Sequence, residues 1–162
     1  MKFYIFAPSR MKWVRKKGRK GCLFCKIAKG DPKTPEKVLY KSRSVMVVMN
    51  IYPYNTGHLQ VFPMRHVEKF EELTDEEISS LFIMVKKCVK LLKKVLNPAG
   101  FNIGMNIGGE ITGASVKHLH IHIVPRFGRD TGFMEVIAET KVLPETLEQT
   151  YERLKKEVEM LK

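Results

Sequence analysis

The sequence predicts an α+β domain with a mostly antiparallel sheet, one long helix and a C-terminal helix. Three observations support this class. Short apolar segments follow one another at hairpin-like spacing, one long segment has helical periodicity, and the order along the chain is strands, helix, strands, helix. The chain has 162 residues, 44% of them hydrophobic, which suits one globular domain. We therefore expect a basic N-terminal arm over residues 1–21 and a single domain over residues 22–162.

The N-terminal arm holds most of the positive charge. The net charge is +12, and the first 30 residues contain ten Lys or Arg and no acidic residue, so the remaining 132 carry about +2. Such an arm can attract phosphate-rich partners, nucleic acid among them, by long-range electrostatics. A solvated terminal segment is the alternative.

Membrane insertion and secretion are not predicted. The least charged stretch, residues 45–64, contains Asn, Gly and Pro residues that favour strands and a turn over a membrane span. The apolar residues 3–7 are too few for the core of a signal peptide. We expect a cytoplasmic protein without a membrane partner.

The first half of the domain predicts three strands and then the long helix. Residues 37–50 favour two short strands around a turn at residues 41–44, and residues 58–63 favour a third strand. The motif T-D-E-E at residues 74–77 is a capping box that begins the helix, and N-P-A-G ends it near Asn97. Its predicted apolar face, at spacings of three and four, consists of Ile78, Leu81, Phe82, Val85, Cys88, Val89 and Leu92.

The second half predicts two more strands and the C-terminal helix. Residues 101–109 favour a strand that ends in paired glycines, and a loop leads from it to the segment H-L-H-I-H-I-V-P-R at residues 118–126. Pro144, in a first helical turn, is predicted to begin a charged helix that runs to Leu161.

Three of the five histidines lie at every second position of one apolar segment. In a strand this period places His118, His120 and His122 on one face, and Leu119, Ile121 and Ile123 on the other. Two histidines at i and i+2 can share a zinc ion if other ligands approach. A neutral imidazole can instead act as a covalent nucleophile that its neighbours orient. Three ordinary, hydrogen-bonded histidines are the remaining alternative.

A glycine-rich loop and a cysteine pair accompany the histidines. Gly108, Gly109 and Gly113 let backbone N–H groups approach an anion, and Ser115 adds a hydroxyl donor, which together suggest a phosphate site. The pair C-L-F-C at residues 22–25 is more typical of a metal or redox site than of a disulfide. Cys88 is expected to be a small buried hydrophobe in the long helix.

Several segments of the chain resemble those of a known protein family. H-L-H-I-H-I-V matches the signature of the histidine-triad (HIT) nucleotide hydrolases and transferases, and G-H-L-Q-V-F-P-M-R-H resembles their other recurrent segment. The flanks A-P-S-R-M-K-W-V and N-I-Y-P-Y-N-T-G-H-L, with the chain after the triad, are similar to the prokaryotic diadenosine tetraphosphate phosphorylase/hydrolase branch. The resemblance implies a HIT-like fold, cleavage of dinucleoside polyphosphates at the α-phosphate, and a homodimer that pairs through the long helix and an edge strand.

The resemblance also implies roles for single residues. His120 matches the nucleophile that forms a nucleotidyl-histidine, His122 helps to position it, and His58 lies at the active site. Asn50 stands where family members bind the ribose hydroxyls. The nucleotide-binding positions that match are Asn50, Asn106, Gly113, Ala114 and Ser115.

Some family members hold a structural zinc ion through a C-x-x-C pair and two histidines. The matching residues here are Cys22, Cys25, His66 and His118, two thiolates and two imidazoles that would form a closed tetrahedral set. The triad would then be divided, with His118 for the metal and His120 for the chemistry. The alternative is a pair of buried free cysteines.

The chain departs from the family pattern at two positions. Ala114 stands where many members have Gln, and we expect the smaller side chain to admit inorganic phosphate as acceptor, which favours phosphorolysis slightly over hydrolysis. Gly132 stands where the branch often has Asn. A nucleoside phosphoramidate hydrolase is the alternative enzyme. A zinc-stapled nucleotide or nucleic-acid binding module, using the basic arm and Trp13, is the alternative outside enzymes.

Overall fold

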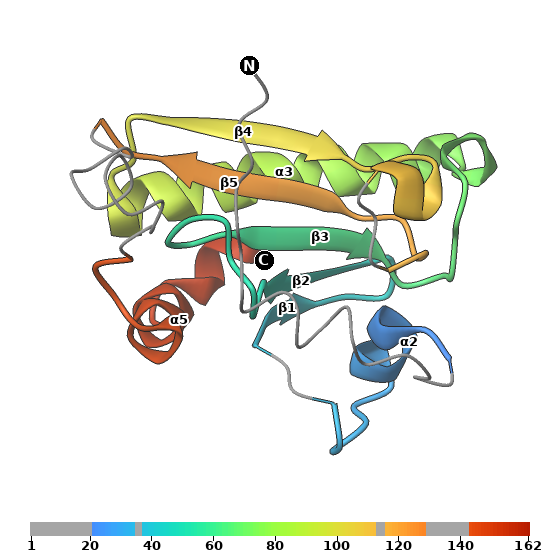
Figure 1. Ribbon diagram of the computed structural model, residues 1–162, viewed down its shortest axis with the longest axis horizontal. Helices are drawn as coiled ribbons and strands as arrows, with labels where there is room; N and C mark the ends of the chain where they lie inside the picture. Colours follow the sequence, from blue (N-terminus) through green and yellow to red (C-terminus); the bar gives the residue numbers. More distant parts are fainter. Residues whose placement is uncertain (1–20, 35–36, 113–115, 129–142) are drawn as a thin grey trace.

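A five-stranded sheet organises the computed structural model, which describes residues 21–34, 37–112, 116–128 and 143–162 (Figure 1). The strand order is β1-β2-β3-β5-β4, and all four neighbouring pairs are antiparallel. The strands are β1 (Val38–Lys41), β2 (Val45–Met49), β3 (Leu59–Pro63), β4 (Gly100–Met105) and β5 (Ile121–Arg126). The predicted α+β class and the mostly antiparallel sheet are confirmed. The part of the chain that is described contains no helix long and apolar enough to cross a membrane.

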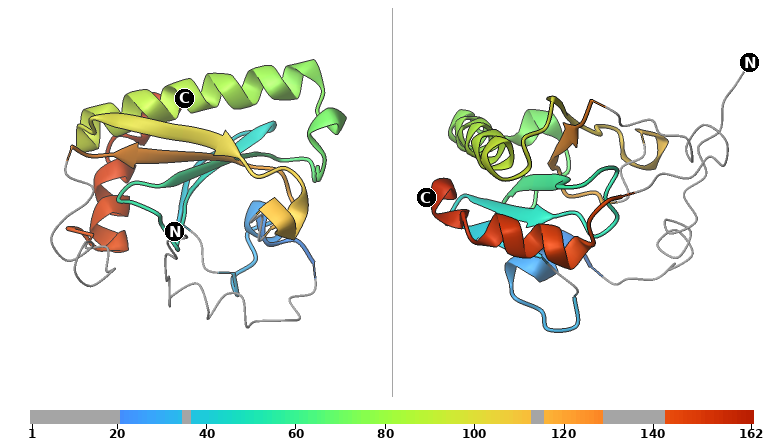
Figure 2. Two further views of the ribbon diagram at one scale, coloured as in Figure 1. Left: turned by 45° about the horizontal axis from the view of Figure 1, so that its top comes forward. Right: turned by 90° about the vertical axis from the view of Figure 1, so that its left-hand side faces the viewer.

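Helices cover both faces of the sheet. The α-helices are α2 (Leu23–Ala28), α3 (Asp75–Leu96) and α5 (Leu147–Lys155), and the 3₁₀ helices are η1 (Phe70–Glu72), η2 (Gly109–Thr112) and η3 (Val158–Leu161). Figure 2 shows α3 along one face of the sheet and α2 beside the other. All five residues of β2 are buried, because alternate side chains point into two apolar clusters, one with α3 and one with α2. The strand therefore lacks the polar face of a half-exposed sheet.

The long helix begins and ends as predicted. The Thr74 hydroxyl accepts the Glu77 N–H at 3.2 Å and the Glu77 carboxylate accepts the Thr74 N–H at 3.1 Å, which completes the capping box. Asn97 ends the helix in the left-handed conformation. Phe82 was wrongly placed on the buried face, since its side chain is 51% exposed. The buried stripe is Leu81, Met84, Val85, Cys88, Leu91 and Leu92.

The histidine strand is shorter than predicted. β5 begins at Ile121 rather than at His118, and its pairing with β3 stops at Val61 opposite Ile121. Pro63, two residues further along β3, has no N–H and so cannot donate a backbone hydrogen bond to a longer β5. The predicted alternation is nevertheless confirmed, because Leu119, Ile121 and Ile123 all lie in the cluster with α3.

The C-terminal helix also begins later than predicted. Thr146 is its N-cap, with a capping box to Gln149, so Pro144 precedes the helix and α5 starts at Leu147. The side chain of Thr146 accepts the Gln149 N–H at 3.2 Å. This local hydrogen bond defines the start more strongly than the fixed φ of a proline does. The helix ends at Lys155, and η3 follows it in place of a continuous helix.

Gly57 permits the turn that leads into β3. Its φ is +77°, and a Cβ atom there would lie 2.4 Å from Cδ1 of Leu96 and 3.3 Å from Cγ of Pro125. We expect Gly57→Ala to lower the free energy of unfolding by about 2–4 kcal/mol, because it adds backbone strain to an overlap in the core. Urea unfolding followed by circular dichroism measures this. Gly100→Ala, where a Cβ would meet nothing within 4 Å, is the control, and equal losses in both variants would contradict the argument.

Candidate active site and metal centre

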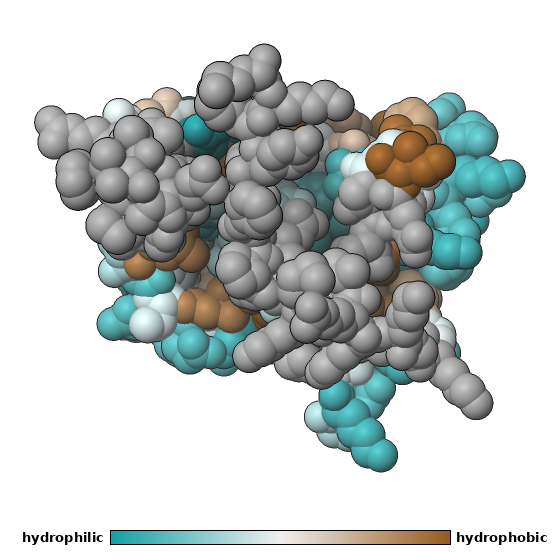
Figure 3. Space-filling model, in the orientation of Figure 1, coloured by the Kyte–Doolittle hydropathy of each residue, from teal (hydrophilic) through white to brown (hydrophobic). Residues whose placement is uncertain are grey.

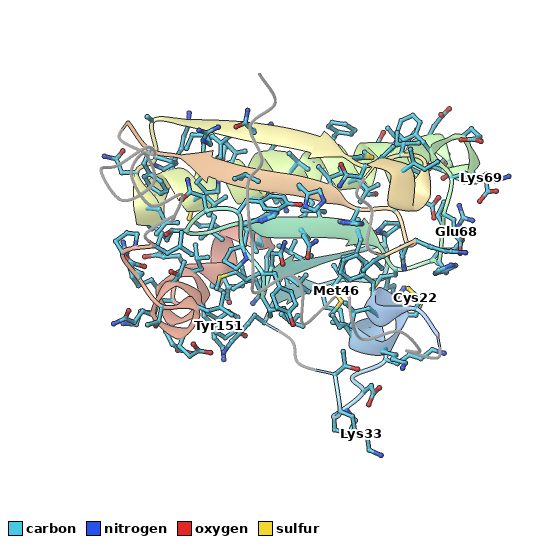
Figure 4. The ribbon with its side chains drawn as sticks, in the orientation of Figure 1. Cys22, Lys33, Met46, Glu68, Lys69 and Tyr151 are labelled. Atoms are coloured by element: carbon cyan, nitrogen blue, oxygen red, sulfur yellow. The ribbon has the colours of Figure 1, made fainter. Side chains whose placement is uncertain are left out.

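The histidine triad lies on the sheet face that carries α2. His118 and His120 are 0% and 6% exposed, and the ring of Phe24 in α2 contacts both, with centroid distances of 5.8 and 4.9 Å. Figure 4 shows Cys22 at the start of α2 and Met46 of β2 nearby. Helix α2 therefore brings the predicted cysteine pair to the first two histidines of the triad.

Two cysteines and two histidines form a compact cluster. The potential ligand atoms of Cys22, Cys25, His66 and His118 all lie within 4.8 Å of one another. The Sγ–Nδ1 distances are 3.5 Å from Cys22 to His118, 3.3 Å from Cys25 to His66 and 3.7 Å from Cys25 to His118. Sulfur and nitrogen ligands of one tetrahedral zinc ion lie about 3.5 Å apart. The four predicted metal residues thus have the chemistry and spacing of a zinc site.

Hydrogen bonds behind the cluster orient its two imidazoles. Nε2 of His118 lies 2.9 Å from the Pro63 carbonyl oxygen, which can only accept, so Nε2 carries the hydrogen and Nδ1 presents its lone pair to the thiols. Nε2 of His66 lies 3.2 Å from the Glu68 carboxylate in the same arrangement. Carbonyl and carboxylate partners of this kind are typical behind metal-binding histidines.

Burial favours the neutral forms of the imidazole and thiol groups in this cluster. Desolvation lowers the pKa of His118 to about 4, so its imidazole is neutral and able to bind a metal. Desolvation raises the pKa of the Cys25 thiol to about 11, with a further contribution from the hydrogen bond that its S–H donates to Cys22. This thiol therefore ionises at neutral pH only beside a cation, and metal binding would release its proton.

His120 is held as a neutral imidazole with one lone pair available. Its Nδ1 lies 2.9 Å from the His118 carbonyl oxygen, so Nδ1 donates its hydrogen and Nε2 keeps the lone pair. Burial lowers the pKa of His120, and the bond to this carbonyl offsets part of the shift. The arrangement suits a nucleophile, which must be neutral and must present one defined nitrogen.

The third histidine of the triad pairs with His58. Nε2 of His58 lies 3.0 Å from Nδ1 of His122, and the rings of His120 and His122 are 4.6 Å apart between centroids. On the other side of His58, its Nδ1 accepts the Tyr54 N–H at 3.2 Å and lies 3.3 Å from the Asn50 side-chain nitrogen. The three histidines predicted for catalysis are therefore contiguous.

The nucleotide-binding positions are only partly described. Asn106 is half-buried and directly follows β4. Met105 pairs with Ile121, so the same register continued by one residue would place Asn106 opposite His120. Gly113, Ala114 and Ser115 lie outside the described residues. So do residues 1–20 of the basic arm and Gly132.

Sequence comparison identifies the family of this site. The HIT domain matches residues 31–129. The chain belongs to the HIT family. The predicted HIT-like fold and the resemblance to the diadenosine tetraphosphate phosphorylase branch are thereby confirmed, as is the expectation of a family of nucleotide-processing enzymes.

Relatives of this HIT protein carry several activities in their names. An AP-4-A phosphorylase from Mycobacterium tuberculosis is 42% identical over 113 residues, which cover 70% of this chain and 58% of that protein. An adenosine 5'-monophosphoramidase from Schizosaccharomyces pombe is 34% identical over 111 residues, or 68% of this chain and 78% of that protein. A zinc-bound histidine triad family protein from Mycobacterium smegmatis has a TM-score of 0.72 at 25% identity, covering 89% of this chain and 97% of that one. The chain thus spans little more than half the length of the phosphorylase.

Two aromatic residues of the HIT site, Phe24 and Tyr54, were not predicted from the sequence. Phe24 packs on His118 and His120 and stacks on Phe62, with centroids 4.2 Å apart. Tyr54 stacks on His58 with centroids 4.9 Å apart. Phe24 lies between the two cysteines of the C-x-x-C pair, which was the only available signal for it. Tyr54 carried no signal, because its contact depends on the turn that reverses the chain before His58.

Proposed function

We propose that this HIT protein cleaves dinucleoside polyphosphates at the α-phosphate, with His120 as the nucleophile. The observation that supports it most directly is the Nδ1–H bond from His120 to the His118 carbonyl, which leaves Nε2 as the attacking nitrogen. A bond forms between Nε2 and phosphorus, and the bond from phosphorus to the bridging oxygen breaks, its electron pair leaving with the polyphosphate. Water or phosphate then attacks phosphorus and releases His120.

The neighbouring histidines support this assignment. His122 and His58 form a hydrogen-bonded pair beside the His120 ring, and we assign them to orienting the phosphoryl group. We assign Asn106, with the loop of Gly113, Ala114 and Ser115, to binding the transferred phosphate. Asn50 contacts His58 in this structure, and a ribose contact would use its remaining hydrogen-bonding capacity.

Incubation with diadenosine tetraphosphate, with and without inorganic phosphate, tests the proposal. Phosphate-dependent release of ADP and ATP establishes a phosphorylase, the outcome that the Ala114 argument and the phosphorylase relative favour. AMP and ATP without phosphate establish a hydrolase. The absence of both product pairs would refute cleavage of this substrate class, and adenosine 5'-phosphoramidate is then the next substrate, because the phosphoramidase relative points to it.

We further propose that Cys22, Cys25, His66 and His118 hold one zinc ion. The ligand spacing, the donor set and the outer partners Pro63 and Glu68 support it. With four protein ligands, the ion would be structural and would join α2 to the segments that follow β3 and precede β5. The single domain over residues 22–162 and the cytoplasmic location stay predictions.

We also propose a homodimer that pairs through β4 and α3. β4 is an edge strand, and the exposed apolar side chains here include Ile103 at 45%, Phe82 at 51% and Ile83 at 57%. We expect light scattering to show a dimer, and Ile103→Lys to weaken it at least about 100-fold by placing a charge in the apolar interface. Ile111→Lys is the control, because it places the same charge on an exposed apolar residue outside β4 and α3. Ile111 is 97% exposed and lies in η2, where Figure 3 shows apolar surface. A monomeric wild-type protein would contradict the proposal.

A further inference from the structure

We infer that Asn50 and the main chain of Tyr54 fix the tautomers of the His58–His122 pair. The pair can then donate hydrogen bonds but cannot transfer a proton to a leaving group. The site then selects leaving groups that depart as oxyanions, such as polyphosphates, over amines that need a proton. The inference rests on the proposed function and names a specificity determinant within it. Asn50 and Tyr54 are positioning residues, since both act through His58.

The amide of Asn50 has a defined orientation. Its Oδ1 accepts the Tyr52 N–H at 2.9 Å, and a backbone N–H can only donate. The other end of the amide, Nδ2, therefore faces Nδ1 of His58, at 3.3 Å, and donates to it. The reverse orientation would set the NH₂ group against the Tyr52 N–H, donor against donor.

The Tyr54 N–H independently indicates that Nδ1 of His58 is a hydrogen-bond acceptor. It donates to Nδ1 of His58 at 3.2 Å, so two donors converge on this atom and it must present its lone pair. The hydrogen of the His58 ring is then on Nε2. Because Nε2 of His58 lies 3.0 Å from Nδ1 of His122, His58 donates to His122. The hydrogen of His122 is in turn on its own Nε2.

These assignments determine what the pair can do during the reaction. If His122 passed its Nε2 hydrogen to a leaving group, it would need a proton on Nδ1 from His58. His58 would then be left as an imidazolate, because the amide groups of Asn50 and Tyr54 cannot supply a proton to its Nδ1. Among the residues that the structure describes, this chain of hydrogen bonds thus ends in donors that are not acids. His122 can stabilise charge on a phosphoryl oxygen, but the pair cannot act as a general acid.

The consequence is a preference among leaving groups. Cleavage of a dinucleoside polyphosphate at the α-phosphate expels a polyphosphate oxygen that is stable as an anion and needs no proton. Cleavage of a nucleoside phosphoramidate expels an amine, whose nitrogen must be protonated as the bond to phosphorus breaks. Both substrates share the adenosine 5'-phosphoryl half, so the difference between them reports on the leaving group.

Asn50→Asp is the decisive substitution. The carboxylate has the shape of the amide but only accepts, so one oxygen can keep the Tyr52 N–H while the other favours a hydrogen on Nδ1 of His58. This charge-assisted hydrogen bond is stronger than the neutral one from the Tyr54 N–H that it displaces. His58 can then carry hydrogens on both nitrogens and pass one toward His122. We expect kcat/KM for adenosine 5'-phosphoramidate, divided by that for diadenosine tetraphosphate, to rise at least about tenfold. Any change in nucleoside binding affects both substrates and cancels in the ratio.

Asn50→Ala is the matched control. It removes one donor to His58, while the Tyr54 N–H still holds Nδ1 as an acceptor, so the ratio should stay within about twofold of the wild-type value even where both rates fall. Nitrogen NMR of protein with labelled histidines reads the tautomers directly. In the wild type we expect His58 and His122 with hydrogen on Nε2 alone, and in Asn50→Asp we expect His58 with hydrogen on both nitrogens.

The two readouts separate the possible failures. Hydrogen on Nδ1 of His58 in the wild type would overturn the inference, whatever the kinetics. So would a ratio that does not move in Asn50→Asp although His58 gains its second hydrogen. If the wild type processes neither substrate, the proposed function fails and the substrate preference falls with it. The NMR spectrum then still decides the hydrogen positions.

Discussion

Replacing His120 with asparagine will abolish nucleotidyl transfer and leave the fold intact. The asparagine amide can still donate to the His118 carbonyl, as Nδ1 of the imidazole does, but the nucleophilic Nε2 is gone. We expect kcat for diadenosine tetraphosphate to fall at least about 10⁴-fold, since a covalent mechanism has no second route of similar rate. The free energy of unfolding should change by about 1 kcal/mol or less, because the buried hydrogen bond is kept.

Mass spectrometry of the intact protein distinguishes covalent catalysis from simple binding. Brief incubation with substrate should add one nucleotidyl group to the wild type and none to His120→Asn. An adduct on the asparagine variant, or full turnover by it, would falsify the assignment of the nucleophile. Circular dichroism of both proteins shows whether a lost rate reflects chemistry or unfolding.

We expect removal of the proposed zinc ion to lower stability and activity together. We expect the purified protein to contain one zinc ion per chain, and strong chelators or Cys25→Ser to lower the free energy of unfolding by about 3–5 kcal/mol. Activity should fall as well, because the His118 side chain is one of the proposed zinc ligands while its carbonyl accepts the hydrogen bond from His120. Elemental analysis and thermal unfolding with and without chelator measure these effects.

Cys88 supplies the control for the metal experiment. It is fully buried in α3, and burial raises its pKa to about 12, so it is a neutral core side chain. Cys88→Ala should keep one zinc ion per chain and its response to chelator. Protein that contains no metal and whose unfolding does not change on chelation would contradict the zinc proposal.

Local signals predicted the long helix well. The capping box at Thr74 and the stop at Asn97 depend on residues within one turn, and both are found in the structure. Phe82 was misplaced because it lies one position, or about 100°, from the buried stripe that begins at Leu81. A short window of spacings of three and four does not distinguish neighbouring stripes when apolar residues adjoin both.

Features that depend on distant residues were not predictable in the same way. The start of β5 depends on the neighbouring strand, since the pairing with β3 stops at Val61 opposite Ile121. The alternation of histidines identified the face of the triad, and the family resemblance identified the members of the metal cluster. The contact between His58 and His122 depends instead on the register of β3 and β5, in which Gln60 is opposite His122. A single sequence does not reveal that register.

The wide sequence separation within the metal cluster has a consequence for folding. Cys22 and His118 are 96 positions apart, and Cys25 and His66 are 41 apart. Closing loops of this size costs an unfolded chain several kcal/mol in conformational entropy, roughly 4 kcal/mol for the longer one. We therefore expect the four ligands to assemble only after the sheet has brought β3 and β5 together, so that binding of the proposed zinc ion would be a late event. Zinc would then act on the lifetime of the finished fold, by slowing its unfolding, more than on the rate at which the chain folds.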